Sequence, residues 1–363
     1  MSYEYLNARL RHLKARLLKP EQFAQLLGLK DLEEFIAALA ETDYGPEIER
    51  SSVEFAGYPL VEDALTQHTQ RVFRHLADMA VGEADTLIRI LLERFEVFNL
   101  KTVLRGFHAG VDPEETARSL FPTLLYPTAF YQELLKREGI AAVVDYLLAV
   151  GNRFYKPLAE ALPDYEATRR LARLESALDA FYFGSARRTL REMTSESAEI
   201  VRKMLGVEVD VLNLVYALRV VEAGVEAEEK FQYILPGGER IKEPLMRELL
   251  SSLDKAAFLR RLQETPYARA LGEFDETITA GELQERLEAW LYNQNCRIDP
   301  GRFFDIQPVA AYIWRVNVEV TNLRVIASGI ERGASRQAIE DQLIWVPGVM
   351  PERAAAGATA GAS

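Results

Sequence analysis

Hydrophobic residues recur along the chain at the three- and four-residue spacing of an amphipathic helix. Leu6, Leu10, Leu13 and Leu17 share one helical face, with charged residues between them. Similar leucine stripes occur at residues 87–95, 171–178 and 283–291. Alternation typical of strands is scarce, and Gly- and Pro-containing turns separate the helical stretches. The pattern therefore predicts an all-α fold.

A short glutamate pattern occurs three times at a constant interval. An apolar residue, Glu, any residue, Ala or Trp, and Leu stand in order around Glu62, Glu175 and Glu288. Each glutamate is 113 residues from the next. A fixed period of this size indicates internal duplication.

An asparagine pattern repeats with nearly the same period. Asn99, Asn213 and Asn322 each have an acidic residue three positions earlier, and these are Glu96, Asp210 and Glu319. Each also has a glycine eleven positions later, and these are Gly110, Gly224 and Gly333. An acid and an asparagine three apart share a helix face, and a terminal glycine fits a helix stop. Three helices ending at these glycines are predicted.

A third pattern, a tyrosine in a turn-like setting, occurs at Tyr44, Tyr155 and Tyr267. The three patterns keep the same order in each copy. We therefore expect three helical repeats, covering residues 1–118, 119–235 and 236–346. Residues 347–363 are rich in Pro, Gly and Ala, and we expect a disordered tail there.

An asparagine inside a helix competes for backbone hydrogen bonds and needs a fixed polar partner. Its partner is either a neighbouring loop carbonyl, a structural role, or a ligand on a central surface; three equivalent copies favour the structural role. The repeated glutamates have the same two interpretations. Arg105 and Arg219, six residues after the first two asparagines, can pair with the nearby acids or with the repeated glutamates, or can face a partner. The third copy has Ser328 there.

Composition limits the function classes. The 363 residues carry a formal net charge of −12, which disfavours nucleic-acid binding. One cysteine and four histidines leave little for metal chemistry. The sequence contains no P-loop, dinucleotide-binding or nucleophile-elbow motif, so we expect no cofactor and no catalytic site. No apolar run approaches the ~20 residues of a membrane span, and the N-terminus lacks the apolar core of a signal peptide.

One charge asymmetry stands out at the N-terminus. Arg9, Arg11 and Arg16 belong to a basic stretch in an otherwise acidic chain. The stretch is either a helix face balanced by acidic neighbours or a contact surface for an acidic partner.

Three segments resemble one known family. Residues 5–11, 96–106 and 319–326 are similar to the C subunit of archaeal and bacterial V-type (A-type) rotary ATPases, a relative of the d subunit of the vacuolar proton pump. The resemblance covers about residues 3–346. It implies three similar helical units around a pseudo-threefold axis, forming a funnel.

The resemblance also implies a function. The family's subunit is a non-catalytic part of the central stalk, peripheral on the cytoplasmic side of the membrane. It is a socket that joins the rotor-shaft subunits D and F to the proteolipid ring, and it meets the catalytic A and B subunits indirectly. The alternatives are a generic helical-repeat adaptor unrelated to the membrane and an all-helical enzyme with an unrecognised site.

Overall fold

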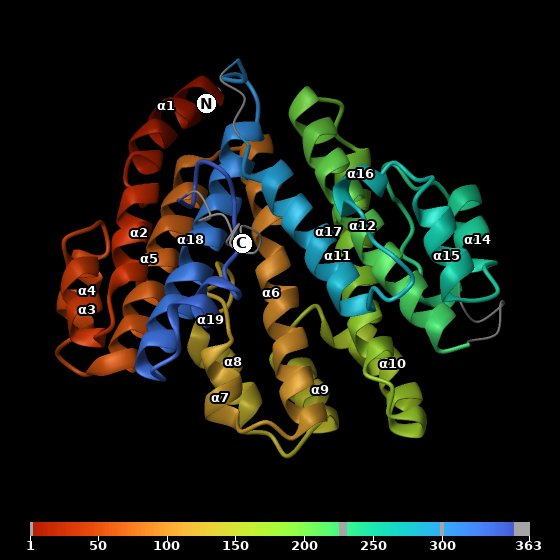
Figure 1. Cartoon of the computed structure of the whole chain (residues 1–363), viewed down its shortest axis with the longest axis horizontal. Coiled ribbons are helices and arrows are strands. Elements are labelled where there is room, and N and C mark those ends of the chain that lie inside the picture. Colours follow the sequence, from red (N-terminus) through yellow and green to blue (C-terminus); the bar gives the residue numbers. More distant parts are fainter. Residues whose placement is uncertain (1–2, 225–230, 298–300, 352–363) are drawn as a thin grey trace, which may run out of the picture. The chain divides into compact units, whose positions relative to one another are not determined.

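A computed structural model describes residues 3–224, 231–297 and 301–351 (Figure 1). Within these residues all the regular elements are helical, and the only β pairing is an isolated bridge between Pro347 and Met350. The predicted all-α class is confirmed. The elements are α1 (Tyr3–Lys14), α2 (Pro20–Gly28), α3 (Leu32–Ala40), α4 (Gly45–Ser51), α5 (Gly57–Met79), α6 (Glu83–Ala109), α7 (Pro113–Arg118), α8 (Thr128–Leu135), α9 (Ile140–Ala149), α10 (Tyr155–Thr168), α11 (Ala172–Arg191), α12 (Glu196–Glu222), the 3₁₀ turn η1 (Phe231–Tyr233), α14 (Glu243–Leu250), α15 (Lys255–Leu262), α16 (Ala268–Leu271), α17 (Ala280–Asn295), α18 (Gln307–Glu331) and α19 (Arg336–Glu340).

The chain forms two compact units. Unit 1 comprises Met1–Asn7, Gln70–Leu291 and Ile298–Ala310, and unit 2 comprises Ala8–Thr69, Tyr292–Arg297 and Ala311–Ser363. Unit 1 thus holds the first two asparagine-bearing helices. Unit 2 combines segments from both ends of the sequence. The three repeat boundaries drawn from the sequence remain a prediction.

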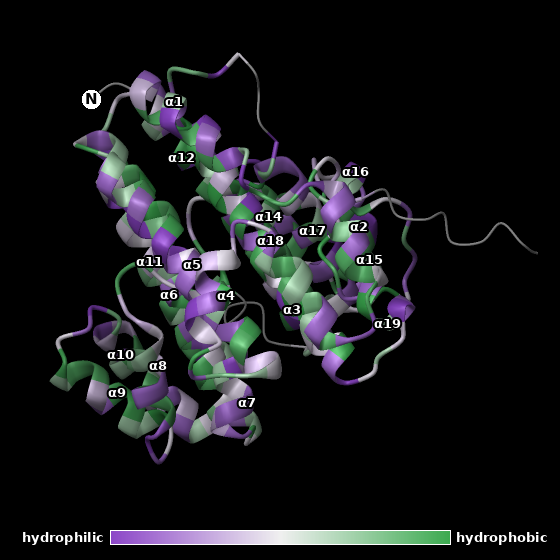
Figure 2. Ribbon diagram, turned by 90° about the vertical axis from the view of Figure 1, so that its left-hand side faces the viewer, coloured by the Kyte–Doolittle hydropathy of each residue, from purple (hydrophilic) through white to green (hydrophobic). Residues whose placement is uncertain are grey.

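Unit 1 is organised around three long helices. Helix α11 packs against α6, α10 and α12, while α6 also contacts α7, α8 and α9 (Figure 1). Helix α12 packs against α14 and α15, and buried Leu218, Phe258, Leu262 and Leu283 belong to one core cluster there. Both hydrophobic and hydrophilic residues occur along each long helix, as amphipathic packing requires (Figure 2).

Unit 2 contains the short helices α2, α3 and α4 together with parts of α1, α5, α17 and α18. Asp31 starts α3 by accepting hydrogen bonds from the backbone amides of Glu33 and Glu34. On α1, Leu10 and Leu13 are buried, as the leucine stripe predicted. Leu17 follows the end of that helix and is only partly buried.

The asparagine-bearing helices α6, α12 and α18 end where their glycines predicted. Gly110, Gly224 and Gly333 have φ angles of 66°, 62° and 65°, in the left-handed region that favours glycine. The three predicted helix stops are confirmed.

Near the ends of α6 and α18, a second glycine lets a following short helix pack closely against the long helix. Seven residues after its asparagine, Gly106 faces Thr116 of α7, and a Cβ there would lie 2.5 Å from the Thr116 hydroxyl oxygen. Gly329 faces Ile339 of α19, whose Cγ1 would lie 2.4 Å from an added Cβ. A short helix therefore folds back onto the end of α6, and another onto the end of α18.

The expected disordered tail needs a correction at its start. Val349 and Met350 are buried, and the Met350 sulfur lies 3.1 Å from Asn322 Nδ2, because this segment packs into unit 2. Residues 352–363 lie outside the described residues. No helix in the described part of the chain combines the length and the apolar character that a membrane crossing needs.

Candidate functional site: three repeated polar locks

Each repeated asparagine is buried and forms two hydrogen bonds to the backbone of a loop residue 22 positions later in the chain. Its Nδ2 donates to the loop carbonyl, and its Oδ1 accepts from the backbone amide of the same residue. Asn99 holds Phe121 (2.7 and 2.7 Å), Asn213 holds Leu235 (2.8 and 2.8 Å), and Asn322 holds Ile344 (2.9 and 2.8 Å). A carboxylate offers no donor for the carbonyl, so only an amide satisfies both backbone groups.

The acidic residue one turn before each asparagine also accepts hydrogen bonds from backbone amides. Glu96 accepts from the Leu125 amide at 3.0 Å. Asp210 accepts from two amides, and Glu319 accepts from the Leu18 amide at 2.6 Å. These partners are donors, which suits a carboxylate. We call each acid and asparagine, with the backbone they hold, a polar lock: the first on α6, the second on α12 and the third on α18.

A buried tyrosine hydroxyl completes each lock. Tyr267 donates to Asp210 at 2.8 Å and Tyr44 donates to Glu319 at 2.8 Å. Tyr131 donates to Glu96 in the first lock. The acid therefore ties its own helix to a loop and to a second helical segment.

The position that corresponds to Tyr44 and Tyr267 near α10 differs from the Tyr155 that the sequence pattern predicted. Tyr44 and Tyr267 occupy the N-cap positions of α4 and α16, and the N-cap of α10 is Phe154 rather than Tyr155. Phe154 is fully buried, whereas Tyr155 is only partly buried. Phe154 has no hydroxyl, and in the first lock the hydroxyl bound to Glu96 belongs to Tyr131 on α8.

Burial sets the electrostatics of the locks. It raises the pKa of Glu96 and of Glu319 to about 7, against the opposing effect of the hydrogen bonds they accept. It also raises the pKa of Asp210, and it raises the pKa of Tyr44 well above the ordinary value. The first and third locks thus contain carboxyl groups that titrate near neutral pH.

The repeated glutamates lie opposite cations from the asparagine-bearing helices. Arg105 of α6 pairs with Glu175 at 2.5 Å. Arg219 of α12 donates to Gln284 at 2.8 Å, and Gln284 in turn donates to Glu288 at 2.7 Å.

Helix α18 uses a different residue for this contact. Ser328 replaces the arginine, and Arg324, two residues after Asn322, lies 4.0 Å from Glu62 and donates to Thr66 at 3.3 Å. Each glutamate therefore faces one of the three asparagine-bearing helices. No residue pattern in the sequence marked Arg324 as the substitute.

The N-terminal arginines are distributed around α1 and the turn after it. Arg9 and Arg11 are exposed, and Arg16 forms an ion pair with Asp43 at 3.2 Å. Part of this basic stretch is thus balanced within unit 2.

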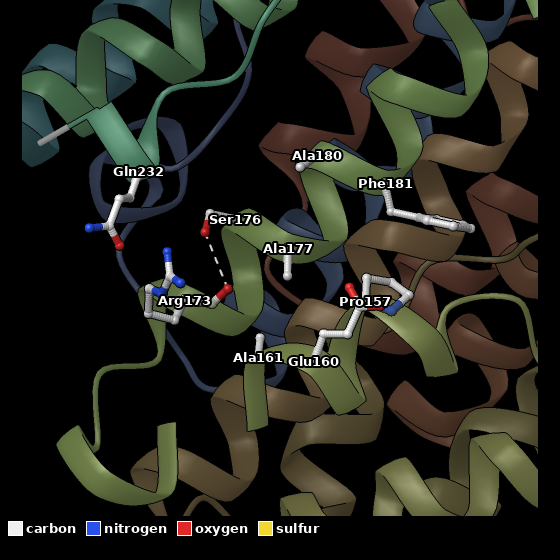
Figure 3. Close-up of a pocket in the computed structure, with 9 residues that line it drawn as sticks. All are labelled: Pro157, Glu160, Ala161, Arg173, Ser176, Ala177, Ala180, Phe181 and Gln232. Carbon is white, nitrogen blue, oxygen red and sulfur yellow. Dashed lines mark hydrogen bonds between the residues drawn. The ribbon is translucent and has the colours of Figure 1, made fainter. Parts of the chain in front are cut away.

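An open pocket of about 350 Å³ lies between α10 and α11 (Figure 3). Its wall is mostly small or apolar, with Ala161, Ala177 and Phe181 among its residues. Two of its polar groups have partners within the protein: Arg173 pairs with Asp164 at 3.2 Å, and the Ser176 hydroxyl donates to the Arg173 carbonyl. Among the described residues, no three His, Cys, Asp or Glu side chains gather as a metal site.

The locks tie helices to loops within the described part of the chain. A family model described as the ATP synthase (C/AC39) subunit matches residues 6–342. The chain belongs to this family, and the family predicted from the sequence is confirmed.

Individual relatives agree along nearly their whole length. The chain is 27% identical to the C subunit of the A-type ATP synthase of Methanocaldococcus jannaschii, over 94% of this chain and 86% of the relative. It is 28% identical to the C subunit from Methanosarcina mazei, over 95% and 93%, and 28% identical to that of Haloferax volcanii, over 94% and 97%.

Proposed function

We propose that this chain is a non-catalytic subunit of an A-type ATP synthase and couples the rotor shaft to the membrane ring. In this proposal it is peripheral on the cytoplasmic side, between subunits D and F and the proteolipid ring. The A and B subunits act on it only indirectly, through the shaft. The family membership and the names of the relatives support the assignment to the complex.

The triple lock is the structural observation that supports a coupling role. A part that transmits torque has to resist bending between its helices and its loops. Each asparagine fixes two backbone groups, and each buried hydrogen bond contributes about 1 kcal/mol while an unmade one costs more. Rigid attachment repeated three times suits a load-bearing body better than a site that changes shape with its ligand.

We also propose that residues 1–118, 119–235 and 236–346 are three copies of one helical unit. The recurrence of the same 22-residue contact in every lock supports three copies of one unit, although the Asn99–Phe121 contact crosses the first boundary by three residues. The third copy is completed by the N-terminal segment, since Leu18 and Tyr44 bind Glu319.

The test is recovery of the tagged chain from membranes of its own source, solubilised in a mild detergent, with mass spectrometry of the proteins that accompany it. The proposal expects the proteolipid together with subunits D, F, A and B. Recovery with unrelated proteins alone would instead favour the helical-repeat adaptor.

A second measurement tests coupling directly. Membranes from cells lacking the chain are compared with membranes to which the purified chain has been added back. We expect ATP hydrolysis to drive ion transport only when the chain is present. Full ATP-driven transport without the chain would overturn the proposal.

A further inference from the structure

Helix α9 is apolar on its outer side as well as on the side that packs into unit 1. The packed side consists of Ile140, Val143, Val144 and Leu147, which are all buried. On the outer side Leu148 is 53% exposed and Tyr146 is partly buried, and Asp145 is the only charged residue among the ten of the helix (Figure 2). A helix that is hydrophobic all round is normally buried all round. The outer side of α9 is therefore a surface that another molecule can cover.

The helices in the corresponding positions have charged outer sides. Helices α2, α8 and α14 each bury one large residue and two leucines three and four positions later, and α3, α9 and α15 follow them in the chain. Helix α3 exposes Glu33 and Glu34, and α15 exposes Arg260 and Arg261. The fold of these helix pairs thus does not account for an apolar outer side on α9.

The apolar surface continues onto α8 and the end of α9. The Phe130 ring stacks on the Tyr126 ring with centroids 4.5 Å apart, and its centroid lies 6.3 Å from that of Tyr146. Val150, the C-cap of α9, is 47% exposed, whereas the C-caps of α3 and α15 are a glutamate and a glutamine. The outer apolar surface of this pair comprises Tyr126, Phe130, Tyr146, Leu148 and Val150.

Carboxylates lie beside this surface. Asp145 is exposed in the middle of α9, and exposed Glu138 and Glu166 line an open pocket of about 500 Å³ beside the first turn of the helix. Among the described residues, these three carboxylates form no hydrogen bond and no ion pair. Arg169, over the Tyr165 ring, also lines the pocket. A partner that covers this surface would therefore meet more negative than positive charge.

The cations of the turn after α8 are already engaged. Lys136 and Arg137 both pair with Glu133, at 2.5 and 3.3 Å, and Arg137 lies over the Tyr146 ring. Anionic lipid headgroups would meet carboxylates of like charge here, whereas an interfacial helix carries Lys and Arg on its polar side. The charges therefore favour a protein with Lys or Arg beside its apolar residues over a membrane surface.

We propose that the outer apolar surface of α8 and α9 binds an apolar segment of another subunit of the complex, with a Lys or Arg of that subunit opposite Asp145. The inference rests on the proposed function, because it takes its partner from that complex. Ala141 and Ala142 line the pocket, and their small side chains leave room for a large side chain of the partner. Apolar contact supplies the affinity, and the ion pair fixes the position of the segment.

The first experiment identifies the partner by cross-linking. Cys296 is buried, so Val150→Cys introduces one accessible thiol, which is labelled with a benzophenone maleimide in the purified full chain. The labelled chain is added to membranes that lack it and irradiated, and the products are identified by mass spectrometry. We expect a cross-link to one protein subunit of the ATP synthase. The control Leu253→Cys, at a site 97% exposed on the α14–α15 turn, should give no cross-link to that subunit.

The outcomes separate the two proposals. Cross-links to lipid alone, to a second copy of this chain or to a protein outside the complex would overturn the inference. Absence of a subunit cross-link, in membranes where the labelled chain restores ATP-driven transport, would overturn it and leave the proposed function standing. Failure of the unsubstituted chain to restore transport would overturn both.

The second experiment measures affinity by titrating the chain into the same membranes. Val150→Gln gives α9 the type of residue that caps α15, and Asp145→Lys reverses the central charge. We expect each variant to require roughly tenfold more chain for half-maximal transport, since one buried aliphatic side chain or one close ion pair contributes about this factor. Leu253→Gln should match the unsubstituted chain. Both test sites are exposed, so every Tm should agree within about 2 °C. Equal requirements for all four chains would overturn the inference.

Discussion

The first polar lock predicts a specific difference between two substitutions of Asn99. Asn99→Ala removes both contacts to Phe121 and leaves its amide and carbonyl buried. Asn99→Asp keeps the size and shape of the side chain and still accepts from the Phe121 amide. Its second oxygen then faces the Phe121 carbonyl oxygen, which in the wild type stands 2.7 Å from a donor nitrogen.

The size of the effect follows from the two backbone groups. Each buried group left without a partner costs about 1–3 kcal/mol, so Asn99→Ala should lower the free energy of unfolding by about 2–6 kcal/mol. The carboxyl group introduced by Asn99→Asp can satisfy the carbonyl only when it is protonated, which raises its folded pKa above the unfolded value of about 3.9. Asn99→Asp should therefore be least destabilised below pH 4 and lose stability as pH rises through its folded pKa.

Urea unfolding followed by circular dichroism, at pH 4 to 8, measures both effects. Gln25→Glu is the control, because it makes the same amide-to-carboxylate change at an exposed position of α2. A loss below about 1 kcal/mol for Asn99→Ala would refute the lock as a stabilising contact. An Asn99→Asp deficit, relative to Asn99→Ala, that does not change with pH would refute the assigned role of the amide donor.

Three further predictions concern other parts of the structure. Burial holds the pKa of Glu319 at about 7, above the ordinary value of 4.5, so the folded chain binds this proton more tightly than the unfolded chain. The free energy of unfolding should therefore fall as pH rises between these two values, and Glu319→Gln should remove about 3 kcal/mol of that fall. Urea unfolding at pH 5 and at pH 8 measures this difference. Tyr44→Phe should cost about 1–3 kcal/mol at pH 8 through the lost bond to the Glu319 carboxylate, and unchanged stability there would contradict this contact. Gly106→Ala should lower Tm because its methyl group meets Thr116, whereas Gly184→Ala, in a helix with open space at that position, should raise stability by about 0.5–1 kcal/mol; calorimetry showing the same sign for both would contradict the close approach.

The sequence was sufficient for the helices that carry the locks. The acid and the asparagine share a face because a helix turns every 3.6 residues, and Gly110 can take the left-handed angle that ends α6. An asparagine within a helix also required a polar partner. The partner's position, 22 residues later, depends on how the chain folds back after the helix, and the sequence carries no local signal for that path.

The tyrosine position shows where sequence spacing alone fails to identify the residue that contacts the acid. Tyr155 matches Tyr44 and Tyr267 in the sequence, but the hydroxyl that binds Glu96 belongs to Tyr131. A carboxylate needs a donor at one point in space, and either α8 or the start of α10 can supply it. The packing of these helices decides which position supplies the hydroxyl, and here it is Tyr131 on α8.

The cation opposite Glu62 has the same explanation. A guanidinium reaches several ångströms from its backbone, so Arg324 can serve from a position four residues before Ser328. Long side chains therefore preserve a contact in space while the sequence register changes, and a repeat defined by identical spacing misses the residue.

The third lock has a consequence for synthesis of the protein. Leu18 and Glu319 are 301 residues apart, so the N-terminal segment emerges from the ribosome long before its partner exists. At 5–20 residues per second, the wait is roughly 15–60 s. During this time the Leu18 amide and the Tyr44 hydroxyl lack the Glu319 carboxylate that they bind in the folded protein. Unit 2 thus finishes folding only after translation has passed residue 319.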